Sequence, residues 1–462
     1  MKRKVLAIGT STLMLLLIFT VSTMNRASPQ SQAGELHPIW VKIWGGAGDD
    51  EALSIAVKSP YIYITGETNS YGAGFCDAFL LKYDEENLLW NVTWGGVDED
   101  WGAAIIVAAP HIYIAGLTES YGPHKGYDDI LLLSYDDEGN LLWNSTWCGG
   151  SLNAVAESSS YIYTAGWTNI YGAGNFDVFL LKYDINGNLQ WYRTWGGVKN
   201  DSAMCLAVTP SYIYLAGYTQ SYGKNPIDVF VLKYDKNGNL IWNKTWGGGG
   251  CAHELAVTGS DIYVVGTTGE DNADVFLLKY DEDGELLWDK IWRGPRTDHA
   301  RSIAVSSSYI YISGYTNSFS ESLLDWEALL MKYDENGNLL WIKTWGGKGC
   351  HSANGLAITK SYIYLTGYTA DSPALNKKDV FLLKADLPSE IKEKEGEGAR
   401  QPDVLSYVLI VVIIVLVIII IWIPRRKKKQ PERTQSQHLP QQQPPLTQYP
   451  SQQSSQPKLA KK

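Results

Sequence analysis

Thiol and imidazole side chains, which are common ligands of divalent metals, occur in three consecutive stretches of the chain. Cys251 and His253 follow one Trp-Gly-Gly motif, His299 follows the next tryptophan of this kind, and Cys350 and His351 follow the one after it. Thiolate, imidazole and a nearby carboxylate can together bind a divalent metal. No local ligand motif accompanies these residues, and isolated Cys and His in loops commonly have no such role. The sequence therefore allows a divalent metal here but predicts no cofactor.

A second set of candidate residues is aromatic and recurs in loops of similar sequence. The loops read TNSYGAG, TESYGPH, TNIYGAG and TQSYGKN, and a fifth loop has a phenylalanine close to the equivalent place. The residues are Tyr71, Tyr121, Tyr171, Tyr222 and Phe319. Tyrosine joins an apolar face to a hydrogen-bonding tip, so such a set suits a carbohydrate or protein ligand. The alternative is that each ring packs back onto its own loop.

Carboxylates recur at two positions of a repeated pattern. The first set lies six residues beyond a tryptophan and comprises Asp50, Asp100, Asp201 and Asp298. The second set opens a later apolar segment and comprises Asp77, Asp129, Asp177, Asp228, Asp274, Glu327 and Asp379. An acid present once in every repeat is expected to cap a loop through backbone N–H groups. Two acids for glycoside hydrolysis cannot be singled out among them, and no G-x-S-x-G, H-E-x-x-H or Walker motif is present.

Four N-x-[ST] sequons are candidate glycosylation sites, at Asn91, Asn144, Asn200 and Asn243. Three of them lie three residues before a tryptophan that is followed by Gly or Cys-Gly, at matching positions of the repeat. A surface position in a secreted protein makes such an asparagine an acceptor. The alternative is that these sequons arise by chance on an exposed strand.

The elements that position these residues form a sevenfold repeat. Pairs of tryptophan with the spacing W-x-x-x-W begin at Trp40, Trp90, Trp143, Trp191, Trp242, Trp288 and Trp341. Successive pairs are separated by 50, 53, 48, 51, 46 and 53 residues. A period near 50 is typical of propeller blades.

Each repeat contains four segments with the composition and alternation of strands. Examples are ALSIAV, YIYITGET, DAFLLKYD and NGNLIWNKTW, with Gly or Asn at the breaks. The last repeat lacks a Trp-pair strand, whereas HPIWVKIW precedes the first complete repeat. The sequence therefore predicts an all-β, seven-bladed β-propeller over residues 37–386, closed by an N-terminal strand.

The pattern WGG, DxAxxIAV, YIYxxGYT, DxFLLKYDxxGNLLW resembles the bacterial and archaeal β-propeller repeat of surface proteins, called the SBBP repeat. The resemblance covers about three quarters of the chain and implies a cell-surface location without one fixed activity. The YDxxGNLLW end also resembles the repeat of quinoprotein dehydrogenases. The Asp-to-Gly spacing is one residue shorter here, the repeats number seven, and there is no adjacent Cys pair.

The two ends of the chain predict a membrane protein. Residues 1–27 have a basic start and an apolar run, as in a signal peptide or signal anchor. Residues 387–404 form a charged stalk, and residues 405–423 are uncharged and long enough for a transmembrane helix. The basic, then Gln- and Pro-rich tail at 424–462 is expected to be disordered and cytoplasmic.

Charge supports this orientation and limits the partners. Residues 37–386 hold 23 basic and 42 acidic side chains, whereas residues 425–462 hold nine basic and one acidic. Binding to the phosphates of a nucleic acid needs an excess of Lys and Arg, so the acidic domain argues against a nucleic-acid partner. We therefore expect a membrane-anchored surface propeller, extracellular and non-enzymatic, that binds a protein, envelope or glycan partner. The alternative is an extracellular propeller enzyme of the quinoprotein, lyase or glycosidase kind.

Overall fold

The computed structural model describes residues 33–387, except 125–126, 270–271 and 371–376. The predicted signal segment, nearly all of the predicted stalk, the predicted transmembrane helix and the tail lie outside the described residues. Within 33–387, no helix is long and apolar enough to cross a membrane.

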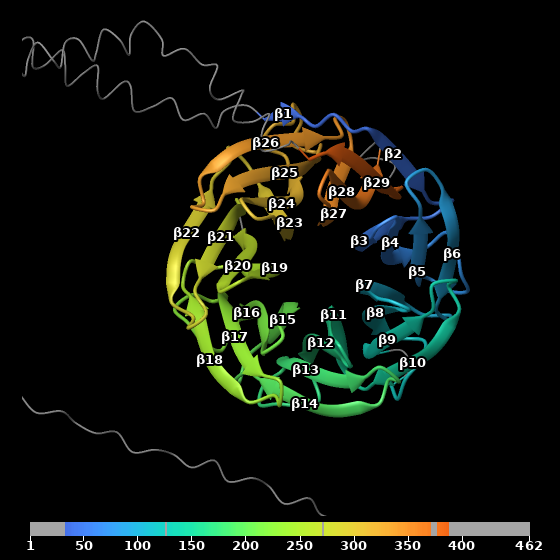
Figure 1. Ribbon diagram of the computed structural model, residues 1–462, viewed down its shortest axis with the longest axis vertical. Helices are drawn as coiled ribbons and strands as arrows, with labels where there is room; N and C mark the ends of the chain where they lie inside the picture. Colours follow the sequence, from blue (N-terminus) through green and yellow to red (C-terminus); the bar gives the residue numbers. More distant parts are fainter. Residues whose placement is uncertain (1–32, 125–126, 270–271, 371–376, 388–462) are drawn as a thin grey trace, which may run out of the picture. The chain divides into compact units, whose positions relative to one another are not determined.

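The described residues form seven sheets arranged around a central axis, each with four antiparallel strands (Figure 1). This arrangement is a seven-bladed propeller, so the predicted fold class is confirmed for this part of the chain. Within each blade the first strand lies nearest the axis and the Trp-pair strand lies outermost. Tyr, Ile and Val fill the alternating strands because branched and aromatic side chains pack well on a pleated surface.

Blades 1 to 4 follow one another along the chain. Blade 1 contains β3 (Asp50–Lys58), β4 (Tyr61–Thr68), β5 (Asp77–Tyr83) and β6 (Leu88–Trp94). Blade 2 contains β7 (Asp100–Ala108), β8 (His111–Thr118), β9 (Asp129–Tyr135) and β10 (Leu141–Trp147). Blade 3 contains β11 (Gly150–Ser158), β12 (Tyr161–Thr168), β13 (Asp177–Asp184) and β14 (Leu189–Trp195). Blade 4 contains β15 (Asp201–Val208), β16 (Tyr212–Thr219), β17 (Asp228–Asp235) and β18 (Leu240–Trp246).

Blades 5 to 7 complete the ring. Blade 5 contains β19 (Cys251–Thr258), β20 (Asp261–Thr268), β21 (Asp274–Tyr280) and β22 (Leu286–Trp292). Blade 6 contains β23 (Asp298–Val305), β24 (Tyr309–Thr316), β25 (Glu327–Asp334) and β26 (Leu339–Trp345). Blade 7 contains β27 (Cys350–Ile358), β28 (Tyr362–Ala370), β29 (Asp379–Asp386) and, as its outermost strand, β2 (Trp40–Trp44).

The N-terminal segment closes the ring as predicted. Strand β2 pairs antiparallel with β29, with Trp44 opposite Val380, so strands from both ends of the repeat region share one sheet. Just before it, β1 (Gly34–Glu35) pairs in parallel with β26 at the outer edge of blade 6. Leu36 is buried between these two pairings. The N-terminal segment therefore links blades 6 and 7. Its strand β1 also covers part of the outer edge of blade 6, which would otherwise be exposed.

The two tryptophans of each pair have different contacts. The first lies against a tyrosine of its own blade, as Trp40 does against Tyr364 with ring centroids 6.4 Å apart, and its indole N–H can reach the turn of the next blade, as that of Trp242 does. The second reaches the next blade, as Trp44 does against Phe79 at 4.8 Å and Trp195 against Phe230 at 4.8 Å. Aromatic side chains thus fill the space between diverging blades, which is the packing role that the repeat pattern predicts.

Candidate functional site

One face of the propeller is formed by two sets of loops, those between the second and third strands and those entering the first strand. A hydrogen bond from each of three loop tyrosines joins the two sets. The Tyr71 hydroxyl donates to the Gly45 carbonyl oxygen at 2.7 Å, Tyr121 donates to Gly95 at 3.3 Å, and Tyr222 donates to Gly196 at 2.8 Å. We call this face the loop face.

The rings of these tyrosines lie on the second tryptophans of the pairs. Tyr71, Tyr121 and Tyr222 have centroids 5.1, 5.1 and 5.0 Å from those of Trp44, Trp94 and Trp195. Even so, 45%, 45% and 44% of these tyrosines remain exposed. The rings are therefore fixed in place and still present much of their surface to solvent.

Tyr171 and Phe319 deviate from this geometry. The Tyr171 hydroxyl accepts a 3.3 Å hydrogen bond from Trp147 Nε1, and its ring lies 5.7 Å from Phe179. Phe319 stacks on Trp292 at 6.0 Å. Both side chains are half-buried. The structure thus brings all five predicted aromatics to the loop face, but Tyr71, Tyr121 and Tyr222 form the most regular set.

In the described part of the chain, the loop face carries more large exposed apolar side chains than the opposite face, and eleven further ones lie on or beside the outermost strands. Among the described residues, ten large exposed apolar side chains lie in its two sets of loops. They are Tyr71, Phe75, Val97, Tyr121, Tyr127, Ile170, Val198, Tyr222, Leu323 and Leu324. The turns of the opposite face contribute Ile185, and Tyr161 lies at the start of β12 on that side. Such an asymmetric apolar surface is typical of an interaction site.

Four of the seven acids that open a third strand cap a loop through backbone N–H groups of described residues, as predicted, namely Asp77, Asp129, Asp177 and Asp228. The aspartates that lie six residues beyond a tryptophan also accept hydrogen bonds from loop groups. Asp50 is fully buried, accepts hydrogen bonds from the hydroxyls of Thr68 and Ser70, and binds the Gly46 N–H at 2.9 Å. Asp201 repeats these contacts in blade 4. In the second set, Asp177 accepts from the Gly174 N–H at 2.9 Å. These acids therefore shape the loop face and are turned away from solvent.

The five candidate metal ligands do not come together, and the described residues contain no group of three or more His, Cys, Asp or Glu that could hold a metal. His351 occupies the capping position that Asp fills elsewhere, with Nδ1 2.8 Å from the Thr369 hydroxyl and Nε2 3.1 Å from the Lys348 carbonyl oxygen. His299 stacks on Tyr315 at 4.5 Å.

The remaining three candidates are also separately engaged. The thiols of Cys251 and Cys350 contact the carbonyl oxygens of Ala252 and Leu324 at 3.3 and 3.6 Å. Burial raises the pKa of both thiols. His253 lies instead at the central channel. Thiols that remain protonated are poor metal ligands.

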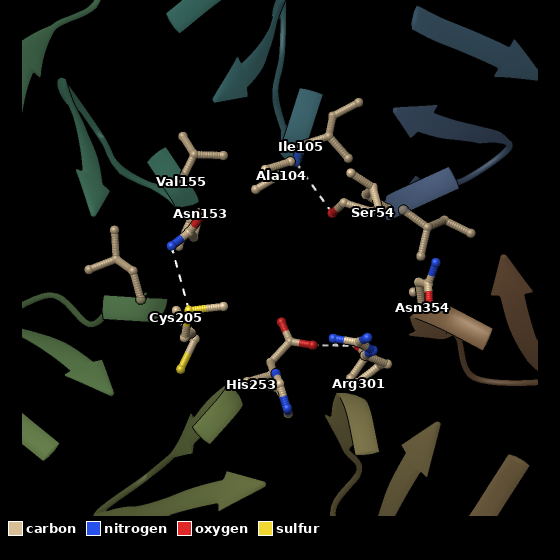
Figure 2. Close-up of a pocket in the computed structure, with 18 of the residues that line it drawn as sticks. Ser54, Ala104, Ile105, Asn153, Val155, Cys205, His253, Arg301 and Asn354 are labelled. Atoms are coloured by element: carbon tan, nitrogen blue, oxygen red, sulfur yellow. Dashed lines mark hydrogen bonds between the residues drawn. The ribbon is translucent and has the colours of Figure 1, made fainter. Parts of the chain in front are cut away.

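The central channel contains a second candidate site, which the repeat pattern did not reveal (Figure 2). Each innermost strand has a β-bulge at the same place, and each bulged residue lines a cavity of about 230 Å³. These residues are Leu53, Ala103, Asn153, Met204, His253, Arg301 and Asn354. Bulges commonly redirect side chains near functional sites.

Charged groups of the channel gather on blades 5 and 6. Glu254 accepts hydrogen bonds from the Ser302 hydroxyl and from the Ile303 N–H, the latter at 3.2 Å. Burial in the channel raises the Glu254 pKa to about 7, and burial together with Arg301 lowers the His253 pKa to about 3. Arg301 Nε is buried without a hydrogen-bond partner among the described residues. The channel thus combines a carboxyl that titrates near neutrality with an incompletely bonded guanidinium.

Sequence reasoning missed Glu254 and Arg301 because their neighbours are those of an ordinary apolar strand. The available signal was a charged residue within the Ala-rich first segments, at CAHELAV and DHARSIAV. A bulge places these side chains in the channel, and bulges have no reliable local sequence mark.

The four sequons lie in two kinds of environment. Asn91, Asn144 and Asn243 are exposed on the outermost strands β6, β10 and β18. Asn200 is half-buried in the loop before β15, and its Oδ1 is buried without a hydrogen-bond partner among the described residues. The first three are therefore sterically accessible acceptors.

Comparison with known proteins finds only remote structural likenesses. No family model matches the chain, and no curated protein matches it. The Pan2 WD40 domain of Neurospora crassa is similar in structure at 11% identity, with a TM-score of 0.47 over 77% of this chain and 98% of that one. The periplasmic gluconolactonase PpgL of Pseudomonas aeruginosa is similar at 12% identity, with a TM-score of 0.45 over 71% and 98%. Likenesses this remote carry no argument. The seven sheets themselves show that the described part of the chain is an all-β, seven-bladed propeller.

Proposed function

We propose that this chain is a membrane-anchored cell-surface protein whose extracellular propeller is a binding module, non-enzymatic, for a glycan, protein or envelope partner. The SBBP-type repeat pattern, the predicted signal and transmembrane segments and the charge difference between domain and tail support this location. The C-terminal tail would then be cytoplasmic.

The loop face carries the binding proposal. Tyr71, Tyr121 and Tyr222 are each fixed by a hydrogen bond to a glycine carbonyl and by a tryptophan beneath the ring, and each remains nearly half exposed. Binding of a ligand that stacks on these rings costs little side-chain conformational entropy, because the rings are already ordered in the free protein. Exposed tyrosine is also well suited to the mixed apolar and hydroxyl surface of sugars.

The test uses the purified full-length chain on a glycan array and against extracts of surface proteins. Replacing Tyr71, Tyr121 and Tyr222 together by Ala should lower binding at least tenfold. A matched triple variant, Leu89→Ala, Leu142→Ala and Leu287→Ala, removes similarly exposed side chains from the outermost strands and should leave binding within twofold. Equal losses in both variants would contradict a role for the loop face.

The central channel supports a second candidate, an extracellular propeller enzyme. A carboxyl with a pKa of about 7 is suited to general acid–base catalysis at neutral pH, and Arg301 can bind an anionic group beside it. Glu254 is the one carboxyl that lines the described cavity, which favours a lyase over a two-carboxylate glycosidase. The volume of about 230 Å³ is below the usual range for substrate pockets, so we rank this candidate second.

Turnover on a panel of acidic glycans separates the two candidates. If the propeller is an enzyme, the wild type should turn over one of these glycans and Glu254→Gln should have no activity. If it is a binding module, the wild type should show no turnover and Glu254→Gln should bind the ligand as the wild type does.

A further inference from the structure

Six of the seven blades hold a lysine at the same place on the third strand, with its ammonium group against aromatic rings. In blade 1, Lys82 Nζ lies 4.1 Å from the ring centroid of Tyr61, 5.4 Å from that of Tyr63 and 5.8 Å from that of Trp90. The equivalent lysines are Lys82, Lys182, Lys233, Lys279, Lys332 and Lys384. We call the two aromatic side chains of the second strand and the tryptophan the aromatic clamp. In blade 5, Asp261 stands in place of the first aromatic and pairs with Lys279 at 2.9 Å. Cation–π attraction favours an ammonium group in this position.

The turn of the following blade supplies the hydrogen-bond acceptors for the clamped lysine. In blade 4, Lys233 Nζ donates to the Glu282 carbonyl oxygen at 2.9 Å, and Trp242 Nε1 donates to the same oxygen at 3.2 Å. Lys82 in blade 1 donates similarly to the Asp137 carbonyl oxygen at 2.9 Å. The clamp and the neighbouring turn therefore form a complete site for a primary ammonium group.

Blade 2 has the clamp but not the lysine. Ser134 stands at the lysine position, opposite Tyr113 and Trp143 in the same register. His111 replaces the first tyrosine and stacks on Tyr113 at 5.8 Å, while Trp143 lies 5.9 Å from Tyr113. Across the described part of the chain, no Lys or Arg lies over the Tyr113 ring, whereas the equivalent tyrosine of every other blade has a lysine over it.

A cavity of about 400 Å³ occupies this place between blades 2 and 3, which are neighbours in the ring (Figure 1). His111, Tyr113, Glu157, Tyr161 and Ile185 are among its lining residues. Three of its lining residues, His111, Tyr113 and Ile185, correspond to Tyr61, Tyr63 and Asp137, which contact the Lys82 ammonium group in blade 1. Ser134 itself is fully buried and does not line the cavity, so the cavity borders the place of the ammonium group and not that of the lysine stem.

The cavity retains acceptors for an ammonium group. Nδ1 of His111 is buried and has no hydrogen-bond partner among the described residues. The Ile185 carbonyl oxygen accepts Trp143 Nε1 at 3.2 Å, as the Glu282 oxygen does in blade 4, but no lysine shares it. Burial and the negative charge of Glu157 raise the pKa of Tyr113. An exposed lysine, Lys58, also borders the cavity, and solvent screens its charge.

We propose that this cavity binds the primary ammonium group of an alkylamine, in the place that the chain's own lysines occupy in the other six blades. His111 and Tyr113, which line the cavity, lie beside the ammonium group, and the Ile185 oxygen and His111 Nδ1 accept its hydrogen bonds. The volume exceeds that of a butylammonium stem, so either a free amine or the side chain of a lysine on another molecule can enter. The site lies on the face opposite the loop face, and its failure would leave the proposed function untouched.

Saturation-transfer NMR with the full-length chain tests the site, with n-butylammonium as the probe and n-butanol as the neutral probe of similar size. We expect butylammonium to bind with a Kd on the order of 1 mM, as befits so small a ligand, and butanol at least tenfold more weakly. Nα-acetyl-lysine methylamide is the third probe. If it binds as well as butylammonium, a polypeptide lysine is an admissible ligand, and if only butylammonium binds, the ligand is a free amine. Equal signals from butylammonium and butanol, or none from butylammonium at 100-fold the expected Kd, would overturn the proposal.

Two variants make the test specific to the clamp. Ser134→Lys supplies the missing lysine and should abolish butylammonium binding while the protein remains folded. Lys233→Ser empties the clamp of blade 4 and should create a second site, seen as a rise in unfolding temperature with added butylammonium. Undiminished binding in Ser134→Lys would place the amine elsewhere and refute the assignment.

Discussion

The hydroxyl of Tyr71 donates a 2.7 Å hydrogen bond to the carbonyl oxygen of Gly45 and so fixes a loop of blade 1 to the connection that leaves blade 7. The same bond recurs between Tyr121 and Gly95 and between Tyr222 and Gly196. Each tyrosine is therefore both a tie between neighbouring blades and an exposed ring on the loop face.

These two roles can be separated by replacing Tyr71, Tyr121 and Tyr222 with Phe. Each variant loses one partly exposed hydrogen bond, so we expect the free energy of unfolding to fall by about 0.5–1 kcal/mol per site. The ring and its tryptophan contact remain, and ligand binding should stay within twofold. Urea denaturation and the glycan array measure the two effects. Binding that falls as far as in the Ala variants would show that the hydroxyls, and not the ring faces, contact the ligand.

Asp201 is expected to be among the most sensitive polar residues of the propeller. It is fully buried and accepts hydrogen bonds from Thr219, from Ser221 at 2.6 Å and from the Gly197 N–H at 2.8 Å. Asp201→Ala removes the acceptor of one buried and two partly buried donors, so the free energy of unfolding should fall by about 3 kcal/mol. The control is Asp235→Ala in an exposed turn, which should cost less than half as much by the same denaturation measurement.

Glu254 should make the stability of the propeller decline as the pH rises. Its pKa in the fold is raised to about 7 from a usual value near 4.5, so the folded chain holds this proton more tightly than the unfolded chain does. The stabilisation is complete below pH 4.5 and is lost as the pH rises through 7. At pH 8, Glu254→Gln should therefore be more stable than the wild type by about 1–3 kcal/mol.

Unfolding temperatures measured from pH 5 to pH 8 check this expectation. The difference between Glu254→Gln and the wild type should widen with pH, whereas Glu138→Gln in an exposed turn should run parallel to the wild type. Parallel profiles for both variants would mean that Glu254 is hydrated in the channel and titrates normally.

Ring closure should depend on Trp44 more than on its neighbours in β2. Trp44 belongs to blade 7 and packs on Phe79 of blade 1 at 4.8 Å, and the Ile43 side chain beside it is 55% exposed. We expect Trp44→Ala to lower the free energy of unfolding by about 2–4 kcal/mol and Ile43→Ala by at most about 0.5 kcal/mol. Chemical denaturation of both variants gives the comparison, and similar losses would argue against closure through this ring contact.

Glycan attachment should distinguish the four sequons when the chain is secreted from a eukaryotic host. Asn91, Asn144 and Asn243 are exposed on outermost strands, whereas the Oδ1 of Asn200 is buried. Glycopeptide mass spectrometry should find glycans on the first three and none on Asn200. The variant Asn200→Gln serves as the control, since it should leave the glycan mass unchanged; a mass decrease would contradict the assignment.

The repeat pattern was sufficient for the architecture because every blade carries its own Trp pair and its own alternating strands. The closing strand β2 could be predicted because the first and last repeats are incomplete in complementary ways. The pairing of β1 with β26 could not, since two residues in parallel pairing leave no periodicity to detect.

The candidate sites depended on tertiary contacts that spacing does not encode. His351 looked like a metal ligand, yet it contacts Thr369 at the position where other blades place an aspartate. Glu254 and Arg301 reach the channel through bulges in strands of ordinary composition. Ser134 in place of lysine is visible in the sequence, but its significance depends on the contact between the lysine and aromatic rings in the other blades, which the sequence does not show.

The pairing of β29 on both of its edges also has a mechanical consequence. The repeat region ends at this strand, which is hydrogen-bonded to β28 on one side and to β2 on the other. A pulling force applied at Leu387 would therefore act along β29, parallel to the strand. The hydrogen bonds of β29 to β28 and to β2 would be loaded in shear and would have to break together instead of one after another. The strand that closes the ring would in this way also make the propeller resistant to extension from its C-terminal end.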